Sequence, residues 1–220
     1  MTQPRVAETS QSITGHAYAE AFDRLQAELL ENNWLETDDL LRNSITTGCV
    51  LEVGSGPGYL GIDWLLQTTH TRLVGLDICS DMVAIAGKHT REFGLADRAV
   101  HLLGSADAIP FEDSVFEAVF TSRSLHEWLN PQIVFTELWR VLKPGGKLYV
   151  SDLRRDLSHK ACNFLNQRIT SDLIRETLKA SIRAAYTMND ITAVLANAEL
   201  DECNVVETLF GLQVTGVKPL

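Results

Sequence analysis

The residues best suited to chemistry lie in the stretch LEVGSGPGYLG, from Leu51 to Gly61. Its glycines fit two patterns. Gly54, Gly56 and Gly58 give G-x-G-x-G, while counting from Gly56 to Gly61 gives G-x-G-x-x-G. Glycines in such a loop let the backbone approach a ligand without a Cβ in the way, and the second pattern is the dinucleotide fingerprint. The stretch predicts a site for an adenosine-containing cofactor and leaves two frames open.

Glu52 and Asp77 are carboxylates near this loop, and only Glu52 helps to choose between the two frames. Glu52 lies inside the predicted strand, and Pro57 lies between the later glycines. A carboxylate there would repel a pyrophosphate and would suit a ligand with positive charge. S-adenosylmethionine has a sulfonium, an ammonium and no phosphate, which favours the frame that starts at Gly54. Asp77 ends the predicted strand LVGLD, at a spacing that lets it accept hydrogen bonds from both ribose hydroxyls in either frame.

A second group of candidates follows the predicted strand at residues 116–122, in TSRSLHEWLNP. His126 is the candidate general base, because an unperturbed imidazole titrates near neutral pH; the alternative is a packing role in a pocket wall. Trp128 is a candidate for the core or the pocket lining, and alternatively for a cation–π contact with a sulfonium. Arg154, in DLRRD, could pair with an anionic acceptor or with neighbouring acids.

These candidates need a scaffold, and the pattern from residue 49 to residue 152 alternates between strands and helices. Strands are predicted at residues 49–53, 71–77, 99–104, 116–122 and 147–152, and helices at 59–67, 80–94 and 131–142. KPGG reads as a turn before the last of these strands. The alternation predicts an α/β fold with a doubly wound, mostly parallel sheet.

The flanking segments have other patterns. The first dozen residues read as a flexible tail, and apolar residues at helical spacing between residues 18 and 41 predict a helical arm. The segment after Asp152 is mostly helical, and two short strands around Gly211 are expected to pair antiparallel at a sheet edge. Ser80 or Asp81 is expected near the N-cap of one helix, and Asn189 or Asp190 is a candidate N-cap of another.

Composition limits the partners and the compartment. The 220 residues are 45% hydrophobic, enough for one buried core, and the net charge of −10 argues against nucleic acid or an anionic membrane as the main partner. The four cysteines are scattered, which indicates a reducing compartment and no disulfide or zinc framework. The N-terminus has no signal-peptide pattern and no apolar run has the length of a membrane span, so we expect a cytoplasmic protein.

Four segments, taken together, resemble a known family. VLEVGSGPG, LVGLDICSDMVAIA, GSADAIPFEDSVFEAVFTSRSLHEW and ELWRVLKPGGKLYVSD occur in this order, at intervals similar to those of class I S-adenosylmethionine-dependent methyltransferases. The small-molecule members, such as the quinone-biosynthesis type, are most similar, and the resemblance covers residues 48–152. It implies a seven-stranded Rossmann-like sheet with an antiparallel last strand. It also implies a helical tail and arm at residues 1–46 and a methyltransferase domain at 47–220, with a helical lid insertion at 153–188.

The resemblance assigns roles to residues of the loop and strand ends. Those expected to line the methionine end of the cofactor are Glu52, Gly54, Ser55, Gly56, Gly58 and Ser122. Those expected beside the ribose are Asp77, Ile78 and Met82, and those expected at the adenine are Ala106, Asp107 and Ala108, with Asp107 accepting from its amino group. Tyr18 resembles a position where family members close over the cofactor.

The implied reaction is methyl transfer from S-adenosylmethionine to a small molecule, with S-adenosylhomocysteine as product. Positioning supplies most of the rate, with His126 as a possible base, and Tyr18, Arg123, Trp128 and Arg154 are the candidate acceptor-binding residues. Ser122 and Arg123 stand where metal-dependent catechol-type enzymes have an acidic residue, so no metal site is expected. We expect a monomer or homodimer. The alternatives are an NAD-dependent oxidoreductase and a non-catalytic S-adenosylmethionine-binding module.

Overall fold

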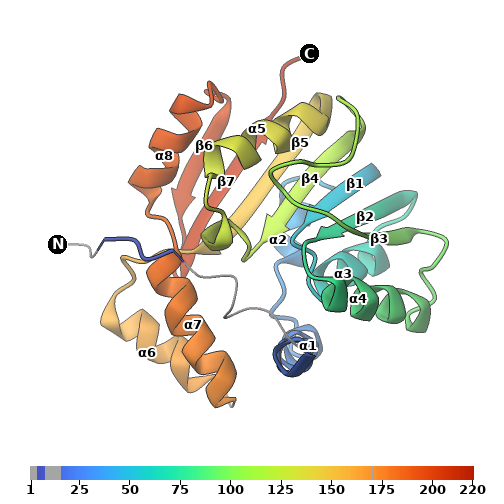
Figure 1. Ribbon diagram of the computed structural model, residues 1–220. Coiled ribbons are helices and arrows are strands. Elements are labelled where there is room, and N and C mark those ends of the chain that lie inside the picture. The colour runs from blue at the N-terminus through green and yellow to red at the C-terminus, as the bar shows by residue number, and fades with distance from the viewer. Residues whose placement is uncertain (1–3, 8–15, 170) are drawn as a thin grey trace.

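The computed structural model describes residues 4–7, 16–169 and 171–220, and these form a seven-stranded sheet with helices around it (Figure 1). The strand order is β3-β2-β1-β4-β5-β7-β6, and β7 runs antiparallel to both of its neighbours. The strands are β1 (Gly48–Val53), β2 (Thr71–Asp77), β3 (Ala99–Leu103), β4 (Phe116–Ser122), β5 (Leu142–Leu153), β6 (Cys203–Glu207) and β7 (Gly211–Val217). The predicted mostly parallel sheet with an antiparallel last strand is confirmed.

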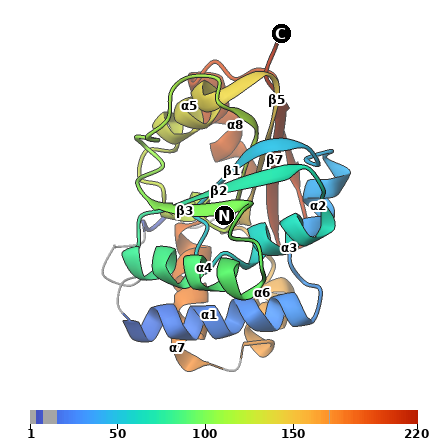
Figure 2. The ribbon, with the colours of Figure 1, turned by 90° about the vertical axis from the view of Figure 1, so that its right-hand side faces the viewer.

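Helices cover both faces of this sheet. In the view of Figure 2, α5 and α8 lie on one side of it, and α2 and α3 lie on the other. The helices are α1 (His16–Glu31), α2 (Thr37–Arg42), α3 (Tyr59–Gln67), α4 (Ser80–Glu92), α5 (Pro131–Val141), α6 (His159–Gln167), α7 (Asp172–Ala184) and α8 (Met188–Asn197). A single 3₁₀ turn, η1 (Leu125–Glu127), follows β4.

Successive side chains of the buried strands face opposite layers of helices. In β1, Val50 packs in the cluster that contains Trp64 of α3, while Leu51 packs in the cluster that contains Phe135 of α5. Because both faces are covered, the strand reads as an almost continuous apolar run. The exception is Glu52, which has the same orientation as Val50 and so faces the side of α3.

A third group of side chains lies at the carboxyl ends of the parallel strands. It joins Tyr18 and Ala21 of α1 to Met82 of α4 and Ile174 of α7, all of them buried. The helices predicted between residues 18 and 41 and after residue 152 are therefore present, and α1, α6 and α7 gather below the sheet in Figure 1. That they act as a lid stays a prediction.

Ser80 and Asp81 lie next to the N-cap of α4, as expected, whereas the cap expected for α8 is wrong by two or three residues. The N-cap of α4 is Cys79, whose backbone N–H donates to Oδ1 of Asp77, 2.8 Å away. The N-cap of α8 is Thr187, which forms a capping box with Asp190 at the N3 position. At α4 the carboxylate of Asp77, two residues before the N-cap, accepts the hydrogen bond. At α8 Asp190 takes part in capping from the N3 position.

The KPGG segment lies inside β5 and does not precede it. Phe116 of β4 pairs with Leu142, but Ala118 pairs with Lys147, so the residues between Leu142 and Lys147 bulge out of the ladder. Gly145 has a φ of +76° and donates its N–H to the carbonyl of Lys218. The backbone does turn here, as expected, but the strand pairs on both sides of the turn.

Gly61 of α3 lies where helix and sheet are closest. A Cβ on it would lie 2.3 Å from Oε2 of Glu52 and 2.3 Å from Cδ2 of Leu73. The missing side chain therefore makes room for the buried carboxyl of β1. In the G-x-G-x-x-G frame Gly61 would lie beside a ligand, but this glycine faces the sheet, which disfavours that frame.

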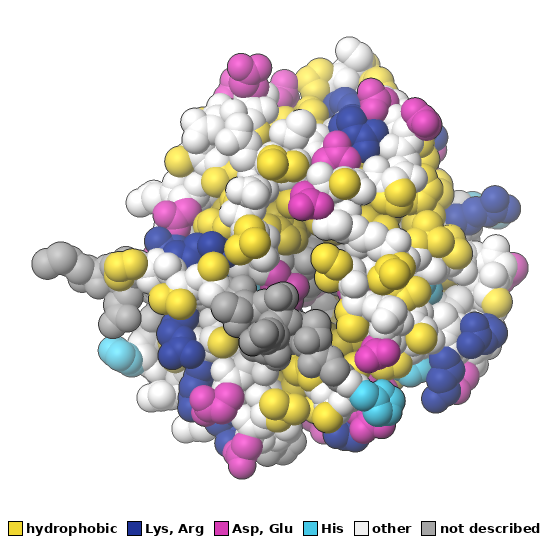
Figure 3. Space-filling view, in the orientation of Figure 1, with side chains coloured by type: hydrophobic (Ala, Val, Ile, Leu, Met, Phe, Trp, Pro, Cys, Tyr) yellow, Lys and Arg dark blue, Asp and Glu magenta, His cyan; other side chains and the backbone are white. Residues whose placement is uncertain are grey.

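The described residues include no helix that is long and apolar enough to cross a membrane. On the face drawn in Figure 3, acidic and basic side chains are interspersed among hydrophobic ones.

Replacement of Gly61 by alanine tests the contact between α3 and β1. Alanine normally stabilises a helix interior by roughly 0.5–1 kcal/mol relative to glycine, but here we expect the Gly61→Ala change to lower the free energy of unfolding by about 1–3 kcal/mol through overpacking. Urea denaturation measures the difference. The matched control is Gly87→Ala in α4, where the nearest atom to a new Cβ is 3.7 Å away, and which should stabilise. A Gly61→Ala protein as stable as the unmodified protein would contradict this.

Candidate active site

Two connected chambers lie at the carboxyl ends of the parallel strands. The loop chamber, about 650 Å³, is bounded by the glycine loop, the end of β2 and the segment after β4. The apolar chamber, about 550 Å³, is bounded by α1, α6, α7 and the β6–β7 connection. The residues that line both chambers are Tyr18, Phe22, Glu36, Arg123 and Glu127. Ligands normally bind at this edge of a parallel sheet.

The glycine loop takes a conformation that requires glycine. Gly54, Gly56 and Gly58 have φ values of +67°, +51° and +86°, which other residues rarely adopt. A Cβ on Gly54 would also lie 2.5 Å from Oγ of Ser124. Gly54 and Gly56 line the loop chamber, whereas Gly58 is the N-cap of α3 and is not among its lining residues.

Asp77 holds this loop in place. Its Oδ2 accepts a hydrogen bond from the N–H of Gly56 at 2.7 Å, and its Oδ1 accepts one from the N–H of Cys79. Burial raises the pKa of Asp77, and these backbone hydrogen bonds oppose the rise. Each carboxylate oxygen has a further acceptor position, and the side chain lines the loop chamber together with Ile78 and Met82.

Buried polar groups without partners surround the loop. Glu52 is 3% exposed and lines the loop chamber; burial and the nearby Asp77 raise its pKa well above the usual range. Among the described residues, Oε2 of Glu52, Oγ of Ser55 and Oγ1 of Thr121 have no hydrogen-bond partner. Two buried carboxyls oppose a pyrophosphate. They fit a ligand that brings positive charge and hydrogen-bond donors, as S-adenosylmethionine does.

Three of the expected cofactor residues lie outside the chamber walls. Ala106, Asp107 and Ala108 follow β3; Asp107 is exposed, and Ala106 packs against the core under α5. The loop is tied to the rest of the site by the N–H of Gly104, which donates to the carbonyl of Asp77. Contact of these three residues with an adenine ring stays a prediction.

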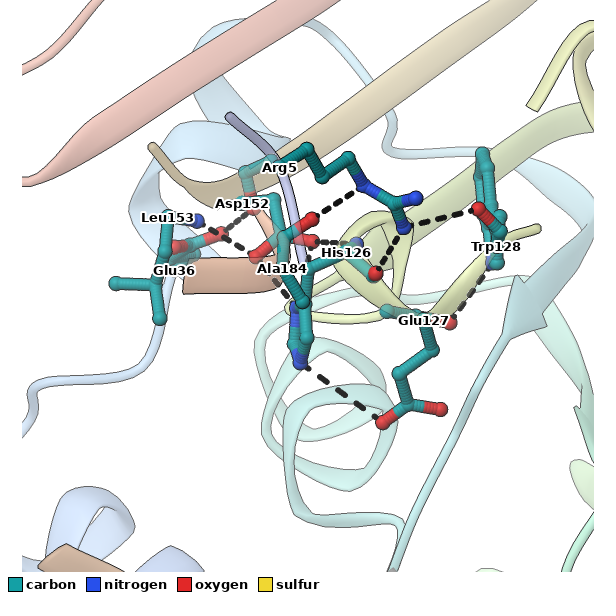
Figure 4. A network of polar contacts seen from close by, with 10 residues as sticks. Arg5, Glu36, His126, Glu127, Trp128, Asp152, Leu153 and Ala184 are labelled. Carbon is teal, nitrogen blue, oxygen red and sulfur yellow. Dashed lines mark hydrogen bonds and ion pairs between the residues drawn. The ribbon is translucent and has the colours of Figure 1, made fainter. Parts of the chain in front are cut away.

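His126 and Asp152 form a buried pair in the wall of the apolar chamber (Figure 4). His126 is 5% exposed and Asp152 is 6% exposed. Nδ1 of His126 lies 2.9 Å from both carboxylate oxygens of Asp152. The same carboxylate accepts from the backbone N–H of His126 at 2.6 Å and of Leu153 at 2.6 Å. Since a carboxylate accepts, Nδ1 carries the proton and Nε2, which is 3.9 Å from Oε1 of Glu127, is the basic nitrogen.

Arg123 lies where the two chambers meet. It has a φ of +58°, a left-handed conformation that is strained for arginine, and its N–H donates to the carbonyl of Ser151 at 2.9 Å. Ser122, just before it, pairs with Ser151 across the two strands and lines the loop chamber. Such strain is concentrated at functional sites.

Two expected acceptor-binding residues are not brought to either chamber. Trp128 is in the core, where it packs edge-on against Phe135 and donates from Nε1 to Oγ of Ser124. Arg154 forms ion pairs with Glu207 and Asp156. Trp128 therefore has the core role that the sequence favoured, and Arg154 pairs with neighbouring acids, the alternative to binding an acceptor. Tyr18 does line both chambers and stacks on Phe22 at a centroid distance of 5.7 Å.

The chambers also contain residues that the sequence did not suggest. Asp152 was visible as an acid at the end of a strand next to β4, and this position could have marked it as a partner for His126. Glu36 comes from the connection between α1 and α2 and accepts a hydrogen bond from Oγ of Ser151. No local signal relates Glu36 to β5, because the contact spans more than a hundred residues of sequence.

Residues 4–7, expected in a flexible tail, are bound to the site. The Arg5 guanidinium donates to the carbonyls of Ala184 at 2.6 Å, His126 at 2.8 Å and Trp128 at 3.3 Å (Figure 4). It also lies 4.2 Å above the ring of Tyr186. The rest of the expected tail, at residues 1–3 and 8–12, lies outside the described residues. The tail prediction is wrong for residues 4–7, because Arg5 satisfies buried carbonyls of η1 and α7.

Comparisons with known proteins agree with this geometry. Residues 51–150 match the model of a family described as methyltransferase domain. This segment is similar to the S-adenosylmethionine-dependent methyltransferases. Among the relatives, the ubiquinone/menaquinone biosynthesis C-methyltransferase of Blochmanniella pennsylvanica is 32% identical over 115 residues, which are 51% of this chain and 45% of the relative. The 2-phytyl-1,4-naphtoquinone methyltransferase of Synechocystis is 35% identical over 117 residues, 52% and 49% of the two chains.

Solved structures share the fold of this chain over nearly its whole length. A putative S-adenosylmethionine-dependent methyltransferase from Methanococcus maripaludis covers 98% of both chains with a TM-score of 0.72 and 21% identity. The plantazolicin methyltransferase BpumL, in complex with S-adenosylhomocysteine, covers 96% of this chain and 93% of its own, with a TM-score of 0.76 and 12% identity. The chain spans about half the length of the curated relatives it matches.

Removal of the Arg5 side chain tests whether residues 4–7 support the segment that carries His126. We expect Arg5→Ala to lower the free energy of unfolding by about 1–3 kcal/mol, since buried carbonyls lose a charged donor. We also expect it to speed amide hydrogen exchange in residues 124–129. Arg24→Ala, an exposed arginine of α1, is the control and should change neither. Unaltered exchange in 124–129 after Arg5→Ala would show that the segment holds its conformation without Arg5.

Proposed function

We propose that this chain is a methyltransferase that transfers the methyl group of S-adenosylmethionine to a small molecule held in the apolar chamber. The observation that supports the proposal is the shared wall of the two chambers. Two buried acids, Glu52 and Asp77, line the loop chamber, and the His126–Asp152 pair lines the apolar chamber. Chambers of this volume are typical of small-molecule sites, which span about 300–1,000 Å³.

In the loop chamber the protein's part is to bind and orient. When bound, S-adenosylmethionine supplies an activated methyl group and leaves as S-adenosylhomocysteine. The loop glycines, which lack a Cβ, let this ligand lie close to the loop backbone. Asp77 accepts hydrogen bonds from its hydroxyl groups. Glu52 and Ser55 offer buried acceptors to its positively charged or donor groups. Since the loop carries no basic side chain, this set of groups also argues against NAD as the ligand.

In the apolar chamber His126 is proposed to remove a proton from the acceptor. Asp152 holds the proton on Nδ1, so Nε2 receives the acceptor's proton, and the resulting imidazolium is stabilised by the same carboxylate. General-base catalysis of this kind contributes typically 10²–10⁴-fold. Alignment of acceptor and cofactor across the shared wall supplies the rest, because orientation alone is worth roughly 7–11 kcal/mol in ideal cases.

The first test measures cofactor binding by isothermal titration calorimetry with S-adenosylmethionine, S-adenosylhomocysteine and NAD. We expect both adenosyl compounds to bind and Asp77→Ala to weaken them at least tenfold, since two ribose hydrogen bonds and the Gly56 contact are lost. Asp81→Ala in the first turn of α4 is the control and should bind normally. Binding of NAD without the adenosyl compounds would refute the proposal in favour of an oxidoreductase.

The second test measures turnover. The protein is incubated with labelled S-adenosylmethionine and a fractionated extract of small metabolites, and a product heavier by one methyl group identifies the acceptor. With that acceptor, His126→Ala should lower kcat by about 10²–10⁴-fold while S-adenosylhomocysteine binds as before. His159→Ala, at the start of α6, should leave kcat unchanged. Full turnover by His126→Ala would exclude it as the base, and binding with no methylated product would support a non-catalytic module.

A further inference from the structure

The outer end of the apolar chamber is formed by stacked aromatic rings and one arginine. Arg168 follows α6 and lies over two rings, 4.9 Å from the centre of Trp34 and 4.3 Å from that of Phe164. Phe164 in turn stacks on Phe210 at 5.2 Å, with the planes 7° apart. All four side chains line the apolar chamber and none lines the loop chamber. Trp34 and Phe164 are 49% and 41% exposed, so the group lies at the rim.

Arg168 is held by these rings in a way that leaves its donors available. A guanidinium carries its five N–H donors in its own plane, and contact with the face of a ring does not consume them. Within the described part of the chain, the guanidinium of Arg168 has no hydrogen-bond acceptor and no ion-pair partner. A fixed cation with available in-plane donors is suited to the bidentate binding of an anionic group.

The acids of the same chamber are mostly engaged elsewhere. Asp152 binds His126, Oε1 of Glu127 lies 3.9 Å from Nε2 of the same histidine, Asp39 is paired with Arg42, and Glu36 accepts from Ser151. Glu28 is the exception: it is exposed on α1, and the described residues give it no ion pair with Arg168. At physiological salt the attraction between two exposed charges that are not in contact is largely screened, so Glu28 does not neutralise the arginine.

We propose that Arg168 binds an anionic group of the acceptor, a carboxylate or sulfonate, at the end of an apolar body that points away from the methyl group. The inference deepens the proposed function and rests on it, because the proposed function makes the molecule in the apolar chamber the methyl acceptor. Arg168 lies at the rim, whereas His126 and the residues shared by the two chambers lie toward the cofactor. The acceptor class is therefore an amphipathic acid whose reacting atom and anionic group lie at opposite ends.

The experiment uses two fluorescent probes of nearly the same shape, with the full chain. 1-Anilinonaphthalene-8-sulfonate carries a sulfonate, and N-phenyl-1-naphthylamine has the same rings without it. We expect the intact protein to bind the sulfonate at least tenfold more tightly, and Arg168→Gln to remove that preference while it changes the affinity for the neutral probe less than threefold. Arg168→Lys keeps the charge without the planar fork and should lie between the two.

Two controls identify the arginine that acts and separate this inference from the proposed function. Lys160→Gln, an exposed basic residue of α6, should leave both affinities unchanged. Calorimetry with S-adenosylhomocysteine on every variant tests the loop chamber alone, so a failed cofactor site and a failed anion site are distinguished. The inference is overturned if the protein does not bind the sulfonate saturably. It is also overturned if Arg168→Gln weakens both probes equally, or if Arg123→Gln and not Arg168→Gln removes the preference.

Discussion

The hydrogen bonds that Asp77 accepts from Gly56 and Cys79 hold the site together. One carboxylate at the end of β2 fixes the loop after β1 and the start of α4, so it sets the spacing of three elements. The loop can follow that path because its glycines adopt positive φ. Burial of the carboxylate raises its pKa, and the backbone donors are what keep a charged acceptor at this position. The rest of the loop chamber is built around this anchor.

The second half of the site depends on contacts between segments that are distant in sequence. Asp152, at the end of β5, orients His126 in the turn after β4, and the two strands are neighbours in the sheet. Arg5 then ties the same turn to the end of α7. Asp152 thus holds the imidazole, and the backbone of its turn is held by Asp152 and by Arg5 of the N-terminal segment. These contacts fix the position of the side chain that we propose as the base.

The sequence predicts the sheet and the cofactor loop well because both depend on local pattern. The bounds of β2, β4 and α3 agree with expectation to the residue, since apolar runs and glycines mark them. The cap of α8 was missed although its signal is local, because Thr187 and Asp190 form a capping box in which Asp190 is the more conspicuous residue. Tertiary contacts have no such signal: nothing near Arg5 indicates that it meets carbonyls more than a hundred residues away. Trp128 illustrates the same limit, because an indole that faces a pocket and one that faces the core look alike in sequence.

The wall shared by the two chambers has a thermodynamic consequence. Tyr18, Phe22 and Arg123 contact both spaces, so a ligand in one chamber restricts the rotamers that a ligand in the other will meet. The first ligand then bears the entropic cost of ordering these side chains, and the second binds to a surface already ordered. Linkage makes the effect reciprocal: the factor by which cofactor alters acceptor affinity equals the factor by which acceptor alters cofactor affinity. Ordering of the shared side chains would thus make the affinity of each chamber depend on whether the other is occupied.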